Sequence, residues 1–151
     1  ELNEAYTNNV LFDVQLADKY GIEFNDRFNK MGGSDSFFFS QMKEKGAKIV
    51  FAKEAILTET VPVSRANLNW IMSRFYRNGY VNYHINELKV GRIKAVKKAF
   101  KSIKIFFSGT SANELATEQD ILERKKFLWA KGMVHAMLGL SYREYDKIHG
   151  S

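Results

Sequence analysis

The sequence predicts an α+β fold, with a small mixed β-sheet portion followed by a mainly α-helical C-terminal portion. Short apolar and β-branched runs between turn formers occupy residues 1–62. From Ser64 onward, apolar residues instead recur at spacings of three and four. The 151 residues are 45% hydrophobic and 26% charged, which is the balance of one compact, folded unit.

Residues 1–62 are expected to carry the sheet. Three segments have the β-branched and aromatic content of short strands, namely residues 8–12, 48–53 and 56–61. The third ends at Pro62, which cannot donate a hydrogen bond to a ladder. We therefore expect a small mixed sheet built from these three segments.

Two helices are expected among the strands. The first is short, follows Asp13 and stops at Gly21. The second follows a sharp bend at two adjacent glycines, begins with Ser34 or Asp35 as N-cap and ends at Gly46. Its aromatic residues are expected to pack against the sheet.

Residues 63–151 are expected to form a helical region of three longer helices. Ser64 is the expected N-cap of the first, which continues beyond Tyr80. A break near Gly91 separates it from a second helix over residues 92–107. The last helix is expected over residues 113–139.

The predicted helix at residues 92–107 is basic and amphipathic. Its apolar residues follow a 3-4-3-4 spacing: Ile93, Val96, Phe100, Ile103 and Phe107. The remaining side is rich in lysine, at Lys94, Lys97, Lys98, Lys101 and Lys104. An apolar stripe at this spacing most often packs against neighbouring helices, and we favour that arrangement here. The alternative is a helix resting on an anionic lipid surface, with its lysines toward the headgroups.

Positive charge is concentrated in the middle of the chain. The formal net charge is +6, and residues 62–107 hold ten basic side chains against Glu87 alone. Such a block indicates an anionic partner, which could be phosphate groups, a membrane surface or nucleic acid, although a solvated helix face is an equally weighted explanation. No recognisable nucleic-acid-binding pattern accompanies the charge, so nucleic acid is the weaker candidate.

Several function classes lack the residues they need. The chain has no cysteine and only three scattered histidines, so we expect no metal site of its own. It has no GxSxG, P-loop or GxGxxG pattern. No apolar run reaches the roughly 20 residues of a membrane span, and the N-terminus lacks a signal-peptide pattern. We expect a cytoplasmic protein, peripheral at most to the inner face of the membrane.

The stretch GGSDSFFF is the most unusual local feature. Its glycines allow a sharp bend, and they deliver Asp35 to the first turn of a helix. The positive end of the helix dipole stabilises an ionised carboxylate there, as a proton acceptor requires. From position alone, an N-cap is the favoured role of Asp35 and a general base is the alternative.

Three segments together resemble the C-terminal half of family 2 glycosyltransferases, which are inverting enzymes of the GT-A type. They are AYTNNVLF with FNDRFNKMGGSDSFFFSQMKEKGAKIVFAKEAILTETVP, then SRANLNWIMSRFYRNGY, then WAKGMVHAMLGLSYREY. Their order and spacing are similar to those of bacterial members that act on surface polysaccharides. The resemblance implies the acceptor-side part of a nucleotide-sugar-dependent enzyme that makes a bacterial polysaccharide or glycolipid.

The resemblance implies that Asp35 is the catalytic base that deprotonates the acceptor hydroxyl. The acids that flank this aspartate in the family are Ser34 and Phe37 here, which leaves one carboxylate. The positions that the resemblance assigns to substrate binding are Gly32, Gly33, Ser34, Glu59, Arg65, Trp70 and Arg74.

The family's donor-binding half is not recognisable in this sequence. In the family it carries an Asp-x-Asp motif that presents Mg²⁺ or Mn²⁺ to the nucleotide-sugar, and this chain has no Asp-x-Asp. The chain, which begins at Glu1, is therefore expected to be a fragment that is inactive alone and prone to self-association through uncovered surface. The alternative is a non-catalytic helical binding or assembly module, whose basic face contacts anionic lipid or nucleic acid.

Overall fold

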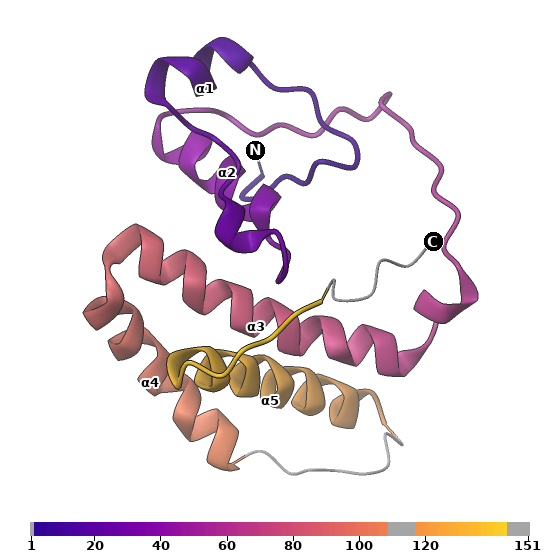
Figure 1. The fold of residues 1–151 in the computed structure, drawn as a ribbon. Coiled ribbons are helices and arrows are strands. Elements are labelled where there is room, and N and C mark those ends of the chain that lie inside the picture. The colour runs from indigo at the N-terminus through magenta and orange to yellow at the C-terminus, as the bar shows by residue number, and fades with distance from the viewer. Residues whose placement is uncertain (1, 109–116, 145–151) are drawn as a thin grey trace. The chain divides into compact units, whose positions relative to one another are not determined.

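The computed structural model describes residues 2–108 and 117–144, and every regular element within these ranges is a helix (Figure 1). The chain divides into two compact units, Glu1–Thr60 and Val61–Ser151, which we call unit 1 and unit 2. The predicted α+β class is therefore wrong, because the described residues contain no strand.

Unit 1 holds three short helical elements: α1 (Val14–Tyr20), the 3₁₀ turn η1 (Asp26–Phe28) and α2 (Ser34–Glu44). Local caps explain α1, since Asp13 Oδ1 accepts a hydrogen bond from Gln15 N at 2.9 Å and Gly21 ends the helix at a φ of 59°. α2 differs from expectation at its start. Its N-cap is Gly33, which has no side chain, so neither Ser34 nor Asp35 is the N-cap.

Large aromatic side chains fill the core of unit 1. Phe37, Phe38 and Phe39 are consecutive on α2 and all three are buried. Successive helical residues point about 100° apart, so α2 is covered on more than one side. Phe24 stacks on Phe38 with 4.4 Å between ring centroids, and Phe12 meets Phe38 edge-on at 5.2 Å. α2 is thus the central element of unit 1.

The three predicted strands, at residues 8–12, 48–53 and 56–61, are irregular segments. A strand requires a ladder of backbone hydrogen bonds, whereas residues 2–60, as described, show one such bond between distant segments, from Leu2 N to Ile49 O at 2.8 Å. Around residues 52–56 the backbone forms local bonds, such as Ala55 N to Ala52 O. Every residue from 50 to 69 is exposed, so this long run contributes no buried side chain.

Unit 2 contains the 3₁₀ turn η2 (Val63–Arg65), α3 (Leu68–Val90), α4 (Arg92–Ser108) and α5 (Glu118–Met137). The three predicted helices are therefore confirmed, with different starts. Ser64 lies in η2, and Asn67 caps α3 through a 2.9 Å bond from Trp70 N. Thr117 begins α5 with a reciprocal capping box to Asp120. Residues 113–116 of the predicted last helix lie outside the described residues.

Two glycines bring α3 and α5 into backbone contact. A Cβ atom added at Gly79 would lie 1.9 Å from Trp129 O, and one added at Gly132 would lie 2.0 Å from Tyr76 O. Both distances are far below any real Cβ contact, so only glycine fits at either position. The two helices can therefore approach more closely than side chains would allow, and their contact forms the centre of unit 2 (Figure 1).

Candidate functional site

Asp35 is the second residue of α2, directly after a bend in which Gly32 and Gly33 have φ values of 78° and 92°. Residues other than glycine seldom adopt such angles, so the bend depends on both glycines. The Asp35 side chain is half-buried, and its Oδ1 accepts a hydrogen bond from Ser36 N at 2.8 Å. This geometry holds a carboxylate at the positive end of α2.

Tyr6 senses the charge of Asp35 and is hydrogen-bonded to Glu4. The Tyr6 hydroxyl donates to Glu4 Oε2 at 2.6 Å. This hydrogen bond, partial burial and the negative charges of Glu4 and Asp35 raise the pKa of Tyr6 to about 12. Sequence reasoning missed both residues as site candidates, since they precede Asp35 by about 30 positions and form no pattern with it. The Tyr6 phenol therefore interacts with two carboxylates, with Glu4 through a hydrogen bond and with Asp35 through its charge.

An apolar cavity of about 320 Å³ lies elsewhere in unit 1. Its walls come from Ala5, residues 10–13 and Leu16, from Phe39 and Met42 of α2, and from residues 47–50. Asp35 is not among the lining residues. The cavity therefore suits an apolar group and offers no polar cleft around the aspartate.

The other predicted substrate-binding residues fall into separate places. Gly32, Gly33 and Ser34 adjoin Asp35 at the start of α2. Glu59 is exposed in the irregular end of unit 1, and Arg65 is exposed in η2. Trp70 and Arg74 meet one turn apart on α3, with the guanidinium 5.2 Å from the centre of the indole ring. The predicted residues thus form two separate groups: Gly32, Gly33 and Ser34 beside Asp35 in unit 1, and Trp70 with Arg74 in unit 2.

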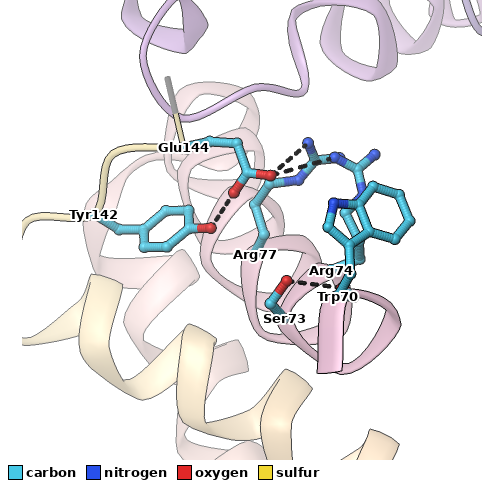
Figure 2. Close-up of polar contacts among 6 residues, drawn as sticks. All are labelled: Trp70, Ser73, Arg74, Arg77, Tyr142 and Glu144. Carbon is cyan, nitrogen blue, oxygen red and sulfur yellow. Dashed lines mark hydrogen bonds and ion pairs between the residues drawn. The ribbon is translucent and has the colours of Figure 1, made fainter. Parts of the chain in front are cut away.

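The residues around Arg74 form a polar and aromatic cluster (Figure 2). Arg74 and Arg77 each direct Nη1 toward Glu144 Oε1, at 3.7 and 3.9 Å. The Tyr142 hydroxyl donates a hydrogen bond to the other oxygen of Glu144. Burial and this hydrogen bond raise the pKa of Tyr142 well above its usual range, which keeps the phenol protonated.

Further aromatic side chains support the Tyr142 ring. Tyr76 and Tyr80 of α3 contact it, with centroid separations of 5.2 and 5.5 Å. The Tyr76 hydroxyl is also 2.8 Å from His135 Nδ1 on α5. Burial raises the pKa of Tyr76, whereas burial and the charge of Lys131 lower the pKa of His135. Sequence reasoning found Arg74 but not Tyr142 or Glu144, whose only signal was the Tyr-x-Glu-Tyr ending.

The exposed face of α4 differs from the favoured expectation. Small residues, Ala95, Ala99 and Ser102, face inward and are buried, whereas Ile93, Phe100 and Phe107 are 75%, 59% and 80% exposed. Val96 and Ile103 are half-buried at the edge of the contact. All five predicted contact lysines are exposed: Lys94, Lys97, Lys98, Lys101 and Lys104. Seven-residue spacing aligns the three exposed apolar residues into one stripe beside the lysines.

Neither a metal cluster nor a bilayer-spanning helix is found in residues 2–108 and 117–144. No three His, Asp or Glu side chains gather there closely enough to hold a metal ion. No helix in the same ranges combines the length and hydropathy that crossing a bilayer requires.

Comparison with known proteins finds one informative similarity. The chain is 34% identical over 113 residues to the succinoglycan biosynthesis protein ExoM of Rhizobium meliloti (strain 1021). The matched stretch is 74% of this chain and 37% of that protein, so the chain spans little more than a third of its relative. No protein-family model matches the chain, and no solved structure matches it either.

Proposed function

We propose that this chain takes part in bacterial polysaccharide biosynthesis, as the acceptor-side part of an inverting glycosyltransferase in which Asp35 is the general base. The similarity to a succinoglycan biosynthesis protein supports the pathway class. The observation that carries the catalytic proposal is the placement of Asp35, which follows a double-glycine bend at the start of α2.

The reaction would be a single displacement. The Asp35 carboxylate takes the proton of an acceptor hydroxyl as that oxygen attacks the anomeric carbon of the donor sugar. The bond from that carbon to the nucleoside diphosphate breaks, and the configuration inverts. The phenol of Tyr6, whose pKa is raised to about 12, stays protonated and donates its hydrogen bond to Glu4. Asp35 would orient the acceptor hydroxyl by accepting its hydrogen bond.

The described residues do not fit the metal that the family resemblance implies. They contain no group of three His, Asp or Glu side chains suited to a cation. We therefore assign no step of this reaction to a metal held by this chain, and place Mg²⁺ or Mn²⁺ and the nucleotide-sugar on the donor-binding part of the complete enzyme.

The direct test is Asp35→Asn in the complete protein, assayed by transfer of labelled sugar to its acceptor. General-base catalysis contributes about 10²- to 10⁴-fold, so we expect a loss of that size in kcat. Asp18→Asn is the matched control, because it makes the same chemical change at an exposed position on α1. An Asp35→Asn enzyme that keeps its fold and more than half of its activity would disprove the assignment.

We also propose that α4 rests on an anionic membrane surface. The stripe of Ile93, Phe100 and Phe107 is exposed beside the lysines, and this arrangement favours a lipid interface over nucleic acid, which needs no apolar stripe. Each lysine near such a surface contributes about 1 kcal/mol, and burial of two phenylalanine rings adds a comparable apolar contribution.

Vesicle flotation separates the explanations for α4. Binding to vesicles of phosphatidylglycerol is expected to fall at least tenfold in a Phe100→Ser, Phe107→Ser double variant, and about fivefold for Lys97→Gln. Lys126→Gln, on the exposed side of α5, is the charge-matched control. Binding to a DNA duplex without binding to vesicles would favour the nucleic-acid alternative, and binding to neither would remove both.

A further inference from the structure

The two arginines of α3 share a single carboxylate. Arg74 and Arg77 are three residues apart on one face of α3, and both approach the same oxygen of Glu144 (Figure 2). The Glu144 side chain is 18% exposed and the Arg77 side chain is 10% exposed. One negative charge therefore faces two positive charges in a largely buried place.

The carboxylate does not satisfy these guanidinium groups. Charge-assisted N–H···O hydrogen bonds are about 2.7–2.9 Å long, whereas the two contacts here are 3.7 and 3.9 Å. Glu144 is close enough for charge attraction but too far for hydrogen bonding. In the part of the chain that the structure describes, the buried Nε of Arg77 also has no hydrogen-bond acceptor. Such a donor is costly to leave unpaired, which indicates that a better acceptor belongs here.

The Arg74 guanidinium is oriented by an aromatic contact and is accessible to solvent. The Trp70 ring lies 5.2 Å from the Arg74 guanidinium, which favours one orientation of its planar donor fork. The Arg74 side chain is 33% exposed, so the pair can be reached from solvent. A phosphoryl group carries up to two negative charges and three or more acceptor oxygens, which matches two forked guanidinium groups better than a carboxylate does.

We propose that Arg74 and Arg77 form a binding site for a phosphoryl group, and that Glu144 occupies this site when no ligand is present. Binding would replace Glu144 at the arginines and give Arg77 Nε its acceptor. This inference does not depend on Asp35, because binding requires no sugar transfer. The ligand could be a soluble diphosphate or a phosphate headgroup of a lipid, which present the same chemistry to the arginines.

The experiment is a titration of the 151-residue chain with inorganic pyrophosphate, followed through the side-chain Nε–H resonances of ¹⁵N-labelled arginine. We expect the Arg77 resonance to move downfield as its Nε–H gains an acceptor. Glu144→Gln should lower the Kd at least tenfold, because it removes the competing charge while keeping an acceptor for Tyr142. Arg74→Gln should raise the Kd at least tenfold. Arg74→Lys keeps the charge but not the forked donors, so its Kd should lie between those of the unchanged chain and Arg74→Gln.

Matched variants make the result specific. Glu123→Gln and Arg92→Gln make the same charge changes at exposed positions on α5 and α4, and both should leave the Kd within twofold of the unchanged chain. Arg77 is buried and its replacement would endanger the fold, so the test relies on Arg74 and Glu144 instead. Asp35→Asn should also leave the Kd unchanged, which separates a failure of this site from a failure of the proposed base.

Two results would overturn the proposal. One is a Kd that responds as strongly to Arg92→Gln as to Arg74→Gln, since this would indicate general charge attraction. The other is a Glu144→Gln chain that binds neither pyrophosphate nor vesicles containing phosphatidic acid. Binding of phosphatidic acid alone, strengthened by Glu144→Gln and weakened by Arg74→Gln, would support the site and identify a lipid headgroup as its ligand.

Discussion

The core of unit 1 is filled by large aromatic side chains, whereas the two central helices of unit 2 meet at glycines, which have no side chain. In unit 1, Phe38 and Phe39 of α2 lie in the core among short helices and irregular segments, and Phe37 contacts Phe28. In unit 2, Gly79 and Gly132 let two long helices touch backbone to backbone. Substitution to alanine therefore acts in opposite ways in the two units, since it removes volume from the core of unit 1 and adds volume to the α3–α5 contact of unit 2.

The largest effect is expected from Gly132→Ala. Alanine ordinarily stabilises a helix interior by about 1 kcal/mol relative to glycine. Here the added methyl would collide with the backbone at Tyr76, which cannot rotate away, so we expect unit 2 to lose about 4 kcal/mol or more. Urea unfolding followed by tryptophan fluorescence measures this loss, because Trp70 and Trp129 both lie in unit 2. Lys126→Ala on the exposed side of α5 is the control, and equal midpoints for the two variants would refute the close contact.

Phe38→Ala is the corresponding change in unit 1. Phe38 is 3% exposed and contacts Phe12, Phe24 and Phe39, so its truncation should cost about 3 kcal/mol through lost burial and the cavity left behind. Amide hydrogen exchange across α2 is the suitable measurement, and exchange should accelerate by about two orders of magnitude. Phe24→Ala removes a ring that is 48% exposed and should cost much less. Similar exchange rates for the two variants would contradict the central place of Phe38.

A smaller effect is expected at the start of α5. Thr117→Ala removes the hydroxyl that accepts from Asp120 N and donates to its carboxylate, so unit 2 should lose about 1 kcal/mol. Thr117→Ser keeps the hydroxyl and should retain most of this stability. Urea unfolding by tryptophan fluorescence compares the two, and no difference between alanine and serine would exclude the capping box.

The smallest effect is a pH dependence from His135. Burial and Lys131 lower its pKa in the folded chain, so the unfolded chain binds the proton more readily. Stability from this group is complete above the unfolded pKa of about 6.5 and is lost as the pH falls below it. Between pH 7.5 and 5.5 the free energy of unfolding should therefore fall more in the unchanged chain than in His135→Gln. An equal fall would mean that His135 is not shifted.

The helices were predictable from the sequence because their signals are local. Asp13 and Gly21 delimit α1 by side-chain capping and a left-handed turn, both set within a few residues. The irregular structure of residues 8–12, 48–53 and 56–61, which we predicted as strands, could not be foreseen. A strand forms only with a partner, and β-branched content does not supply one. Tertiary packing also decides which face of α4 is buried. The helical period of α4 was predicted correctly, but its buried face was not. Apolarity favoured Phe100, whereas close packing selected Ala95 and Ala99.

The candidate site divides in the same way. The bend and Asp35 stand together in the sequence, so their joint placement could be predicted from it. The charge interaction of Tyr6 with Asp35 and the pairing of Glu144 with Arg77 join distant parts of the chain, and no spacing rule connects these residues. Tertiary contacts had to be known before Tyr6 or Glu144 could be considered.

The exposed run from residue 50 to residue 69 suggests how the chain could be divided experimentally. It includes the boundary between the units and contains no buried side chain, so a protease that cuts there would sever no core packing. Each half would keep its own proposed functional residues, with Asp35 on one fragment and the two arginines on the other. Recombining the halves, or exchanging one for its counterpart from a relative, would then assign acceptor preference to one half of the molecule.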